Sequence, residues 1–519
     1  NLGHHPLIVQ SHMNTITVRS IQDKTRTYQY NDNGEPMRGG MKDVYFSPDR
    51  SYVVAFYRDT QDFNSKERLK NITTKYYDSF FNREGGEYYK RLYAWPTDVV
   101  EHDKRIGIIV PCYAKNFFFA KGYAGNDLLR GVEKQGKWFA SARFRVNSSR
   151  TKLDASELGD WLSYFQVCVN IARGVKRMHA AGLAHSDLSY KNVLIDPVTK
   201  SAAIIDIDGL VVPGLYPPDV IGTADFIAPE VLATKHMSKT DPLRKLPNRL
   251  TDLHALAVLI YMYLFYRHPL RGGKYFGPLE SEDEDLLLMG EKALFVEHPT
   301  DHSNRNFKRE YGEDGIQKLS PWTDLSRTPY SIAGPYLKEL FEQAFIKGLH
   351  SPMDRPPAVM WEEALIKTND LKLQCSNTSC EQRWFIFNNT KDTSCPFCNT
   401  KYTKTIPVLD FFYQFKGDVW KPDNMRLVVY HQSTLHMWHV NRNIIRNEKI
   451  KESDKVVVGY FALHQGAWVF VNQGLPAMKD LSESKEIPIG QMVELTVGKK
   501  LLLCPEEGGR VITVTIANN

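Results

Sequence analysis

The stretch His185–Asn192, with the sequence HSDLSYKN, decides how the rest of the chain is interpreted. It follows a run with helical apolar spacing and precedes the short apolar run Val193–Ile195, which predicts a loop between a helix and a strand. Asp187 and Asn192 both lie on this loop. Phosphoryl transfer needs a carboxylate near the attacking hydroxyl and oxygen ligands that hold Mg²⁺. The loop therefore offers both residue types that this chemistry requires.

A second acidic stretch, Ile204–Gly209 (IIDIDG), follows directly after another short apolar run. Asp206 at the end of a hairpin is placed to hold a divalent metal. Asp208 is either a second metal ligand or a turn residue that caps Gly209, and the sequence leaves both interpretations open. Taken singly, each acidic stretch also fits an ordinary solvated loop.

The two loops are followed by further motifs in a fixed order: GTADFIAPE at 222–230, Asp252 at the head of an entirely apolar helix, and Asp354–Pro356. This ordered set resembles the eukaryotic-type serine/threonine protein kinase family over residues 30–367. The resemblance implies an α+β, bilobal kinase fold, with an N-lobe at 14–113 and a C-lobe at 114–368. It also implies ATP and Mg²⁺ (or Mn²⁺) as cofactors and a protein hydroxyl as the substrate.

The resemblance carries roles over position by position. Asp187 matches the catalytic base, and Asn192 and Asp206 match the metal ligands. Thr223 matches the threonine of the substrate loop. The motifs also imply that Glu230 pairs with Arg355 and that Asp252 braces the catalytic loop.

The chain departs from the family at the lysine that meets the ATP phosphates. Val54–Tyr57 (VAFY) places tyrosine where the family has that lysine. The segment Gly39–Tyr45 (GGMKDVY) resembles the with-no-lysine kinases, in which a lysine one strand earlier reaches the same pocket. We therefore expect Lys42 to hold the phosphates. If Lys42 is only a solvated strand lysine, the chain is a pseudokinase.

The resemblance also outlines the nucleotide pocket. Gly39 and Gly40 would form the glycine loop, and Val44 would cap the adenine. Val110 and Cys112 would lie in the hinge, whose backbone binds adenine. By spacing, Glu87 is the expected carboxylate partner of Lys42, with Glu84 and Glu67 as alternatives.

The pair Asp206-x-Asp208 also resembles small-molecule kinases such as aminoglycoside phosphotransferases and lipopolysaccharide sugar kinases. The segments at 222–223 and 228–230 favour a protein kinase instead, because they build a peptide platform that those enzymes generally lack. A small-molecule kinase therefore remains an alternative.

Four of the seven cysteines, namely Cys375, Cys380, Cys395 and Cys398, form two pairs within one short segment. Two such pairs can close a tetrahedral Cys₄ site around a structural Zn²⁺. The region 369–406 resembles a zinc ribbon. Clustered cysteines beside isolated ones indicate a reducing compartment with one metal site, not a disulfide framework.

Past the ribbon, short apolar runs at 427–430, 455–458, 468–471 and 511–514 predict a β-sandwich over 407–519. Gly466–Gly474 resembles part of a forkhead-associated (FHA) domain, a class that reads phosphothreonine. The Gly-Arg and Ser-x-x-His pair of that class is not found here. A structural or protein-docking sandwich is the alternative.

The overall charge is mild, with 66 basic and 60 acidic residues. This balance does not favour nucleic acid as a partner. No apolar run is long enough to cross a bilayer and no signal segment is evident, so we expect a cytoplasmic protein without a membrane partner. Residues 1–13 have the character of an expression-tag remnant.

The whole arrangement resembles bacterial kinases associated with tellurite-resistance and stress operons. That resemblance implies two partners, a von Willebrand A-type protein and a metal-dependent phosphatase.

Overall fold

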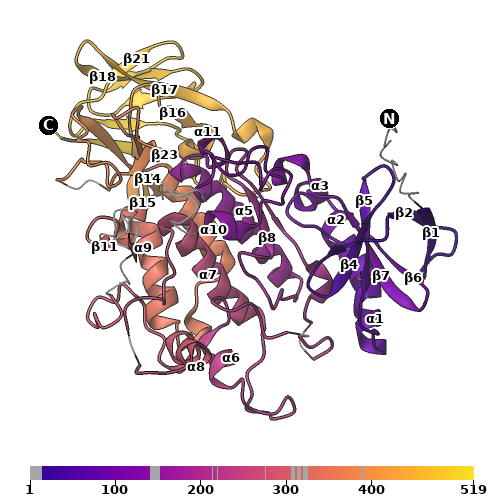
Figure 1. Ribbon diagram of the computed structural model, residues 1–519. Coiled ribbons are helices and arrows are strands. Elements are labelled where there is room, and N and C mark those ends of the chain that lie inside the picture. The colour runs from indigo at the N-terminus through magenta and orange to yellow at the C-terminus, as the bar shows by residue number, and fades with distance from the viewer. Residues whose placement is uncertain are drawn as a thin grey trace, which may run out of the picture.

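The computed structural model describes residues 14–518, apart from 141–151, 213, 219, 275, 306–309, 312–316, 319–324 and 389–390. The expected tag remnant at 1–13 lies outside the described residues. A β-rich lobe, a mainly helical lobe and a second β-rich part follow one another along the chain (Figure 1). This mixed helix and strand content agrees with the α+β class expected from the sequence.

The first lobe is built on a seven-stranded antiparallel sheet with the order β2-β1-β6-β7-β5-β4-β3. In that order the strands are β2 (Thr27–Asp32), β1 (Asn14–Ser20), β6 (Asp98–His102), β7 (Arg105–Pro111), β5 (Tyr52–Tyr57), β4 (Lys42–Phe46) and β3 (Met37–Arg38). The ring of Tyr30 on β2 packs 4.8 Å from that of Tyr45 on β4. The first hairpin therefore covers the outer face of β4 and β5.

A nearly continuous helical segment connects β5 to β6. It consists of α1 (Phe63–Asn71), a π-helical turn at Ile72–Tyr76, α2 (Tyr77–Phe81) and, after a break, α3 (Gly86–Lys90). The Asp62 carboxylate caps α1 by accepting a hydrogen bond from Ser65 N at 2.7 Å. Trp95 packs on Phe80 with ring centroids 4.6 Å apart and donates from Nε1 to Ile72 O, which anchors the helix to the sheet.

The second lobe centres on α5 (Trp161–Ala180), α7 (Arg249–Phe265) and α10 (Ala358–Asn369). Asp160 and Asn248 cap α5 and α7 with capping boxes. Residues 251–265 of α7 are all buried, as its apolar composition on every side predicts. The remaining elements are β8 (Val193–Asp196), β9 (Ser201–Ile204), α6 (Pro229–Ala233), α8 (Ser281–Leu286), β10 (Glu310–Tyr311), β11 (Gln317–Lys318) and α9 (Pro335–Glu342).

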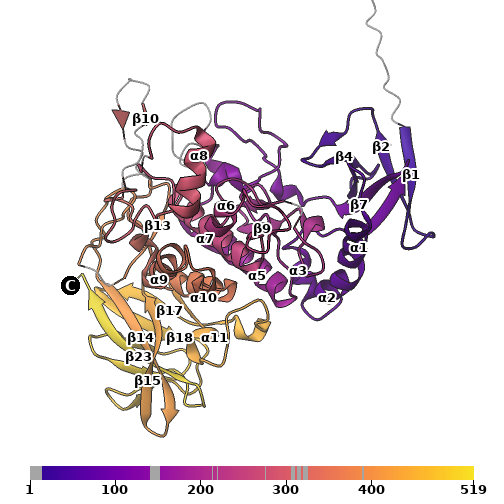
Figure 2. The same cartoon turned by 90° about the horizontal axis from the view of Figure 1, so that it is seen from below.

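After α10, β12 (Lys372–Gln374) and β13 (Trp384–Ile386) form a small hairpin that carries Cys375 and Cys380, and Cys395 and Cys398 follow in the next turn. Two further antiparallel sheets then enclose one apolar core that includes Leu409, Phe461 and Phe470 (Figure 2). Their orders are β15-β14-β23-β22-β19-β20 and β16-β17-β18-β21. The strands are β14 (Ile406–Lys416), β15 (Val419–Val428), β16 (Thr434–His436), β17 (Val457–His464), β18 (Ala467–Asn472), β19 (Lys479–Asp480), β20 (Lys485–Glu486), β21 (Met492–Glu494), β22 (Lys500–Leu502) and β23 (Arg510–Ala517), with the short helix α11 (Met437–Val440) after β16.

The four expected runs all overlap strands of these sheets, but the strands have other bounds. β15 ends at Val428, two residues early, because the Ser433 hydroxyl accepts a hydrogen bond from Tyr430 N and turns the chain. β17 begins at Val457 instead of Lys455.

The C-terminal part is packed directly on the two lobes. Phe397 of the cysteine segment lies edge-on against Trp161 of α5, with ring centroids 4.9 Å apart. Glu448, in the loop between α11 and β17, accepts hydrogen bonds from Tyr89 OH at 2.6 Å and Lys176 Nζ at 3.0 Å. These contacts link the C-terminal part to both lobes.

Candidate active site

The loop 185–192 connects α5 to β8 and is held by Asp252 of α7. The Asp252 carboxylate accepts hydrogen bonds from the backbone N–H groups of His185 at 2.8 Å and Ser186 at 3.0 Å. Ser186 has φ 73°, a left-handed conformation that costs a non-glycine residue roughly 1 kcal/mol. The two bonds offset this cost, so a buried helix fixes the shape of the loop.

Asp187 is held by two side-chain donors. Thr223 Oγ1 donates to Asp187 Oδ1 at 2.7 Å, and Asn192 Nδ2 donates to Asp187 Oδ2 at 3.1 Å. Gly222, before the threonine, has φ +121°, which favours glycine, and a Cβ there would lie 3.9 Å from Asp187 Oδ1. The substrate-loop threonine and the catalytic loop therefore meet at one carboxylate.

A charged cluster lies between the two lobes. Lys42 Nζ on β4 is 2.7 Å from Asp208 Oδ2 and 3.4 Å from Asp206 Oδ1. Tyr57 on β5 donates its hydroxyl to the same Asp208 oxygen. Asp208 is 7% exposed, whereas Asp206 is 50% exposed. The structure thus brings Lys42 to the acidic pair and places tyrosine, not lysine, beside it on β5.

The three charged groups of this cluster shift one another's pKa. Burial and the neighbouring Asp208 raise the pKa of Asp206. Burial acts to raise the pKa of Asp208, but the Lys42 ammonium and the hydrogen bonds from Lys42 and Tyr57 hold it below the ordinary value. Burial acts to lower the pKa of Lys42, and the two carboxylates raise it above the ordinary value. The cluster is therefore a charged ion-pair site.

The glycine pair forms the tight turn between β3 and β4. Gly39 N donates to Lys42 O at 2.9 Å, which closes the turn. Arg58 reaches over it and donates to Gly39 O at 2.9 Å, to Gly40 O, and to Asp43 at 3.2 Å. An arginine directly after β5 thus holds the backbone that is expected to cover the phosphates.

Val44 and the residues expected to form the hinge lie on or directly after two strands that flank β5, namely β4 and β7. Val44 on β4 is half-buried and packs with Ala55, its partner on β5. Val110 is the partner of Val53 across β5 and β7, and Cys112 N donates to Ser51 O at 3.1 Å. Residues 110–112 therefore leave the sheet at the end of β7, next to the start of β5.

Glu87 does not reach Lys42, contrary to the sequence expectation. It lies on α3, is 88% exposed and pairs with Lys90 at 2.9 Å. The alternative Glu67 on α1 pairs with Lys70 at 3.2 Å, and the next residue, Arg68, is buried and donates to Pro217 O. Spacing along the sequence singles out acidic residues of the helical segment between β5 and β6, but it does not determine which of their side chains face the cleft.

The segment that begins at Thr223 is held by the ion pair of Glu230 with the buried Arg355. Arg355 donates from Nη1 and Nη2 to the two oxygens of Glu230, each at 2.8 Å, and its side chain is 1% exposed. Two parallel bonds of this kind fix orientation as well as distance. The segment that runs from Thr223 to α6 is therefore tied to the base of the second lobe.

The residues near Asp187 and Asp206 fit a hard divalent cation. Asn192 uses its amide nitrogen for Asp187, which leaves its amide oxygen out of that bond. Asp206 offers a half-exposed carboxylate on the cleft side. Carboxylate and amide oxygens are the ligands that Mg²⁺ takes in phosphate-binding sites.

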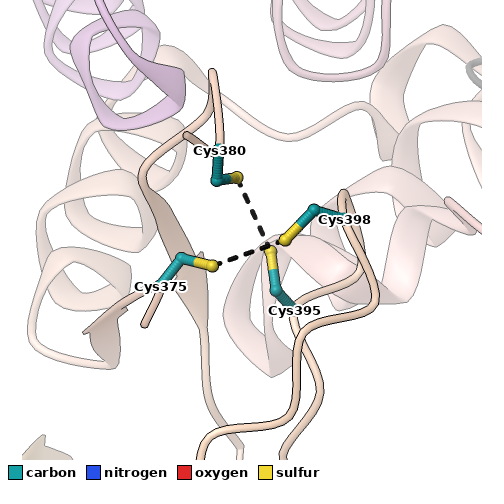
Figure 3. Close-up of side chains that lie close together, drawn as sticks. All are labelled: Cys375, Cys380, Cys395 and Cys398. Carbon is teal, nitrogen blue, oxygen red and sulfur yellow. Dashed lines mark hydrogen bonds between the residues drawn. The ribbon is translucent and has the colours of Figure 1, made fainter. Parts of the chain in front are cut away.

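The four cysteine thiols form the second candidate metal site (Figure 3). All four sulfur atoms lie within 4.8 Å of one another, with Cys375 3.5 Å from Cys398 and Cys380 4.0 Å from Cys395. A tetrahedral zinc site with Zn–S bonds of 2.3 Å has sulfur atoms about 3.8 Å apart. The donor set and its spacing therefore fit zinc, with no fifth protein ligand required.

The thiols of this cluster differ in acidity. Burial acts to raise the pKa of Cys398, but hydrogen bonds from the hydroxyl and backbone of Thr400 lower it to about 6. Burial raises the pKa of Cys375 to about 11. A bound cation would favour the thiolate form of all four.

Comparison with known proteins agrees with this geometry. The family described as the protein kinase domain matches residues 153–310. A dual serine/threonine and tyrosine protein kinase of Apis mellifera is 30% identical over 81 residues, which are 16% of this chain and 8% of that protein. The serine/threonine-protein kinase PSK1 of Saccharomyces cerevisiae is 30% identical over 132 residues, which are 24% of this chain and 9% of that protein.

The chain thus spans less than a tenth of the length of these curated relatives. The matched region covers the loop 185–192, Asp206, the segment 222–230 and α7. Residues 153–310 are therefore similar to the protein kinase domain. The lobe that holds Lys42 and the parts after residue 310 lie outside the matched region.

Proposed function

We propose that this chain is an ATP-dependent serine/threonine protein kinase. The observation that carries the proposal is the arrangement around Asp187, whose carboxylate is held by Thr223 and Asn192 on a loop fixed by Asp252. A carboxylate in this position can accept the proton of an attacking hydroxyl. Lys42, Asp206 and Asp208 supply charges of both signs across the cleft.

In the proposed reaction ATP lies between the lobes, under the Gly39–Gly40 turn, with Val44, Val110 and Cys112 along the adenine. Lys42 binds the phosphates, and Asn192 and Asp206 hold Mg²⁺, which neutralises charge on the transferred group when bound. Asp187 orients a serine or threonine hydroxyl in line with that group. Positioning and charge account for most of the rate enhancement in such reactions.

A protein substrate is favoured by the platform formed by Thr223, α6 and the Glu230–Arg355 pair. Small-molecule kinases would not need a segment tied down in this way. Two relatives are named as dual serine/threonine and tyrosine protein kinases. The proposed preference for serine and threonine therefore has to be tested against tyrosine.

The C-terminal part is proposed to consist of a zinc ribbon at 369–406 and an FHA-like β-sandwich at 407–519. The Cys₄ geometry supports the ribbon, and two sheets around one core support the sandwich. We propose that both dock protein partners in bacterial stress signalling, including a von Willebrand A-type protein and a metal-dependent phosphatase. A cytoplasmic location is part of this proposal. Among the described residues, no helix has both the length and the apolar character needed to span a bilayer.

The test is incubation with γ-labelled ATP and Mg²⁺ or Mn²⁺, using serine, threonine and tyrosine peptides and the chain itself as acceptors. Wild type, Lys42→Ala and Asp187→Asn are compared. We expect label on serine or threonine that both variants lose.

Nucleotide binding without label transfer in wild type would instead favour a pseudokinase scaffold, a reading that the tyrosine at position 57 also supports. ATP turnover that depends on an added metabolite and ignores every peptide would indicate a small-molecule kinase.

A further inference from the structure

Lys42 has a carboxylate partner, but that partner does not come from the helical segment between β5 and β6. We propose that Asp208 and Tyr57 form a positioning pair that sets the Lys42 ammonium for the phosphates, in place of an acid on that helix. The inference rests on the proposed kinase function and adds the residues that prepare its lysine.

The strand register explains how the pair is built. Lys42 and Tyr57 are direct partners across β4 and β5. Cross-strand partners point to the same face of a sheet. The Lys42 ammonium accordingly lies 5.3 Å from the centre of the Tyr57 ring, and both side chains converge on Asp208 Oδ2. One carboxylate oxygen is thus fixed by two neighbours from the sheet.

Burial separates the roles of the two aspartates. Asp208 is 7% exposed and its Oδ2 is occupied by Lys42 and Tyr57, whereas Asp206 is 50% exposed and lies 3.4 Å from Lys42. Asp206 is the carboxylate left open to the cleft and to a cation. Asp208 is enclosed where it can hold the lysine.

The helical segment offers no replacement in the described part of the chain. The ion pairs of Lys42 there are those with Asp206 and Asp208. Glu67 and Glu87 pair with lysines of their own helices, and position 68 carries a buried arginine. The lysine is therefore set by the sheet and the loop before Gly209, independently of the orientation of α1.

The kinetic test compares Tyr57→Phe and Asp208→Asn with wild type and with Tyr45→Phe as a matched control. Tyr45 is on the outer face of β4, against Tyr30, so its hydroxyl lies away from the cleft. We expect Tyr57→Phe to raise the KM for ATP about tenfold, as for one hydrogen bond to a charged group. The Mg²⁺ concentration for half-maximal rate should stay unchanged.

Asp208→Asn should raise the KM further. In the Lys42→Ala background, where label transfer is expected to be lost, the affinity for ATP is measured instead, and Asp208→Asn should change it little, because Asp208 acts through that lysine. If Asp208→Asn instead shifts the Mg²⁺ requirement and keeps its full effect in that background, Asp208 is a metal ligand and the proposal is wrong. Thermal unfolding of each variant checks that the fold is retained.

A measurement without turnover separates this inference from the proposed function. The rate at which an amine-reactive ester modifies Lys42 is followed by peptide mass spectrometry, with the exposed Lys451 as internal reference. An enclosed, ion-paired lysine reacts slowly, so we expect at least a threefold faster modification in Tyr57→Phe and Asp208→Asn. Equal rates in all variants would overturn the positioning pair. Faster modification in the variants of a protein that transfers no phosphate would keep the pair and refute the kinase.

Discussion

The cysteine cluster and the charged cluster of this molecule are assembled in opposite ways. The four cysteine thiols come from two turns of one short segment and lie within 4.8 Å of one another. The charged cluster joins Lys42 and Tyr57 from the first lobe to Asp206 and Asp208 from the second. The first site is a local feature that holds its own segment together. The second exists only when two lobes meet, so it suits chemistry at a cleft better than structural support.

Removal of one thiol is expected to have the largest effect, and to act on stability. In Cys395→Ser the zinc site loses a ligand, and the free energy of unfolding should fall by on the order of 5 kcal/mol, part of the ~10–16 kcal/mol that structural zinc contributes in isolated fingers. Bound zinc and the unfolding midpoint are measured together. Cys504→Ser, outside the cluster, is the control. Full zinc content with an unchanged midpoint would remove the contrast between the sites.

Asp206→Asn should show the reverse pattern. The carboxylate that faces the cleft is lost, so the rate of phosphoryl transfer should fall at least ~100-fold, as when a group that stabilises transition-state charge is removed. The unfolding midpoint should not fall, because the half-exposed side chain has little structural role. Asp103→Asn, also exposed, provides the control. A large loss of stability would mean that the cleft cluster is structural too.

Glu448→Gln tests whether the contacts between the C-terminal part and the two lobes stabilise the fold, in contrast to the charged cluster around Lys42. Glu448 accepts from Tyr89 and Lys176, while Lys176 keeps Glu362 at 2.6 Å. We therefore expect a loss of about 1–2 kcal/mol. Hydrogen exchange should rise at α3 and at residues 441–456. The exposed Glu452→Gln should leave both unchanged, and equal exchange in the two variants would contradict a link through Glu448.

Acid should also weaken the fold through a buried histidine that belongs to neither cluster. Burial lowers the pKa of His268 to about 4, and its Nδ1 accepts a hydrogen bond from Leu270 N at 3.0 Å. The unfolded chain titrates near 6.5, so it binds the extra proton first, and stability falls as the pH drops from about 6.5 to about 4. The slope is about 1.4 kcal/mol per pH unit for one histidine.

Denaturant unfolding at pH 7.5, 6.5 and 5.5 measures this slope. His268→Gln should reduce the slope by the contribution of one proton, about 1.4 kcal/mol per pH unit. Burial also lowers the pKa of His254 and His439, so part of the slope will remain in the variant. A stability that rises on acidification would contradict the assignment.

What the sequence could predict follows the same division between local and assembled features. The loop at 185–192, the apolar helix around 251–265 and the cysteine spacing are each encoded within one stretch, and the structure contains them. The pairing of Glu230 with Arg355 came through the kinase resemblance, and the two side chains are in contact.

The partner of Lys42 could not be predicted from a single stretch of sequence. Glu87 had suitable spacing, but helix α3 points it to solvent. The sequence indicates only a metal ligand or a turn residue at Asp208, because no residue near it in the sequence indicates a contact with β4. In the sequence, Tyr57 is notable only because it replaces the expected lysine. The strand register places its side chain beside Lys42, and its hydroxyl contacts Asp208.

The contact between Phe397 and Trp161 has a consequence for how such a chain can be recombined. A gene that ended after residue 368 would lack the aromatic partner of α5, the zinc-binding turns and the acceptor of Tyr89 and Lys176. The second lobe and its C-terminal appendage are therefore packed as one unit. Exchange of the appendage between chains requires matching changes at Trp161, Lys176 and Tyr89.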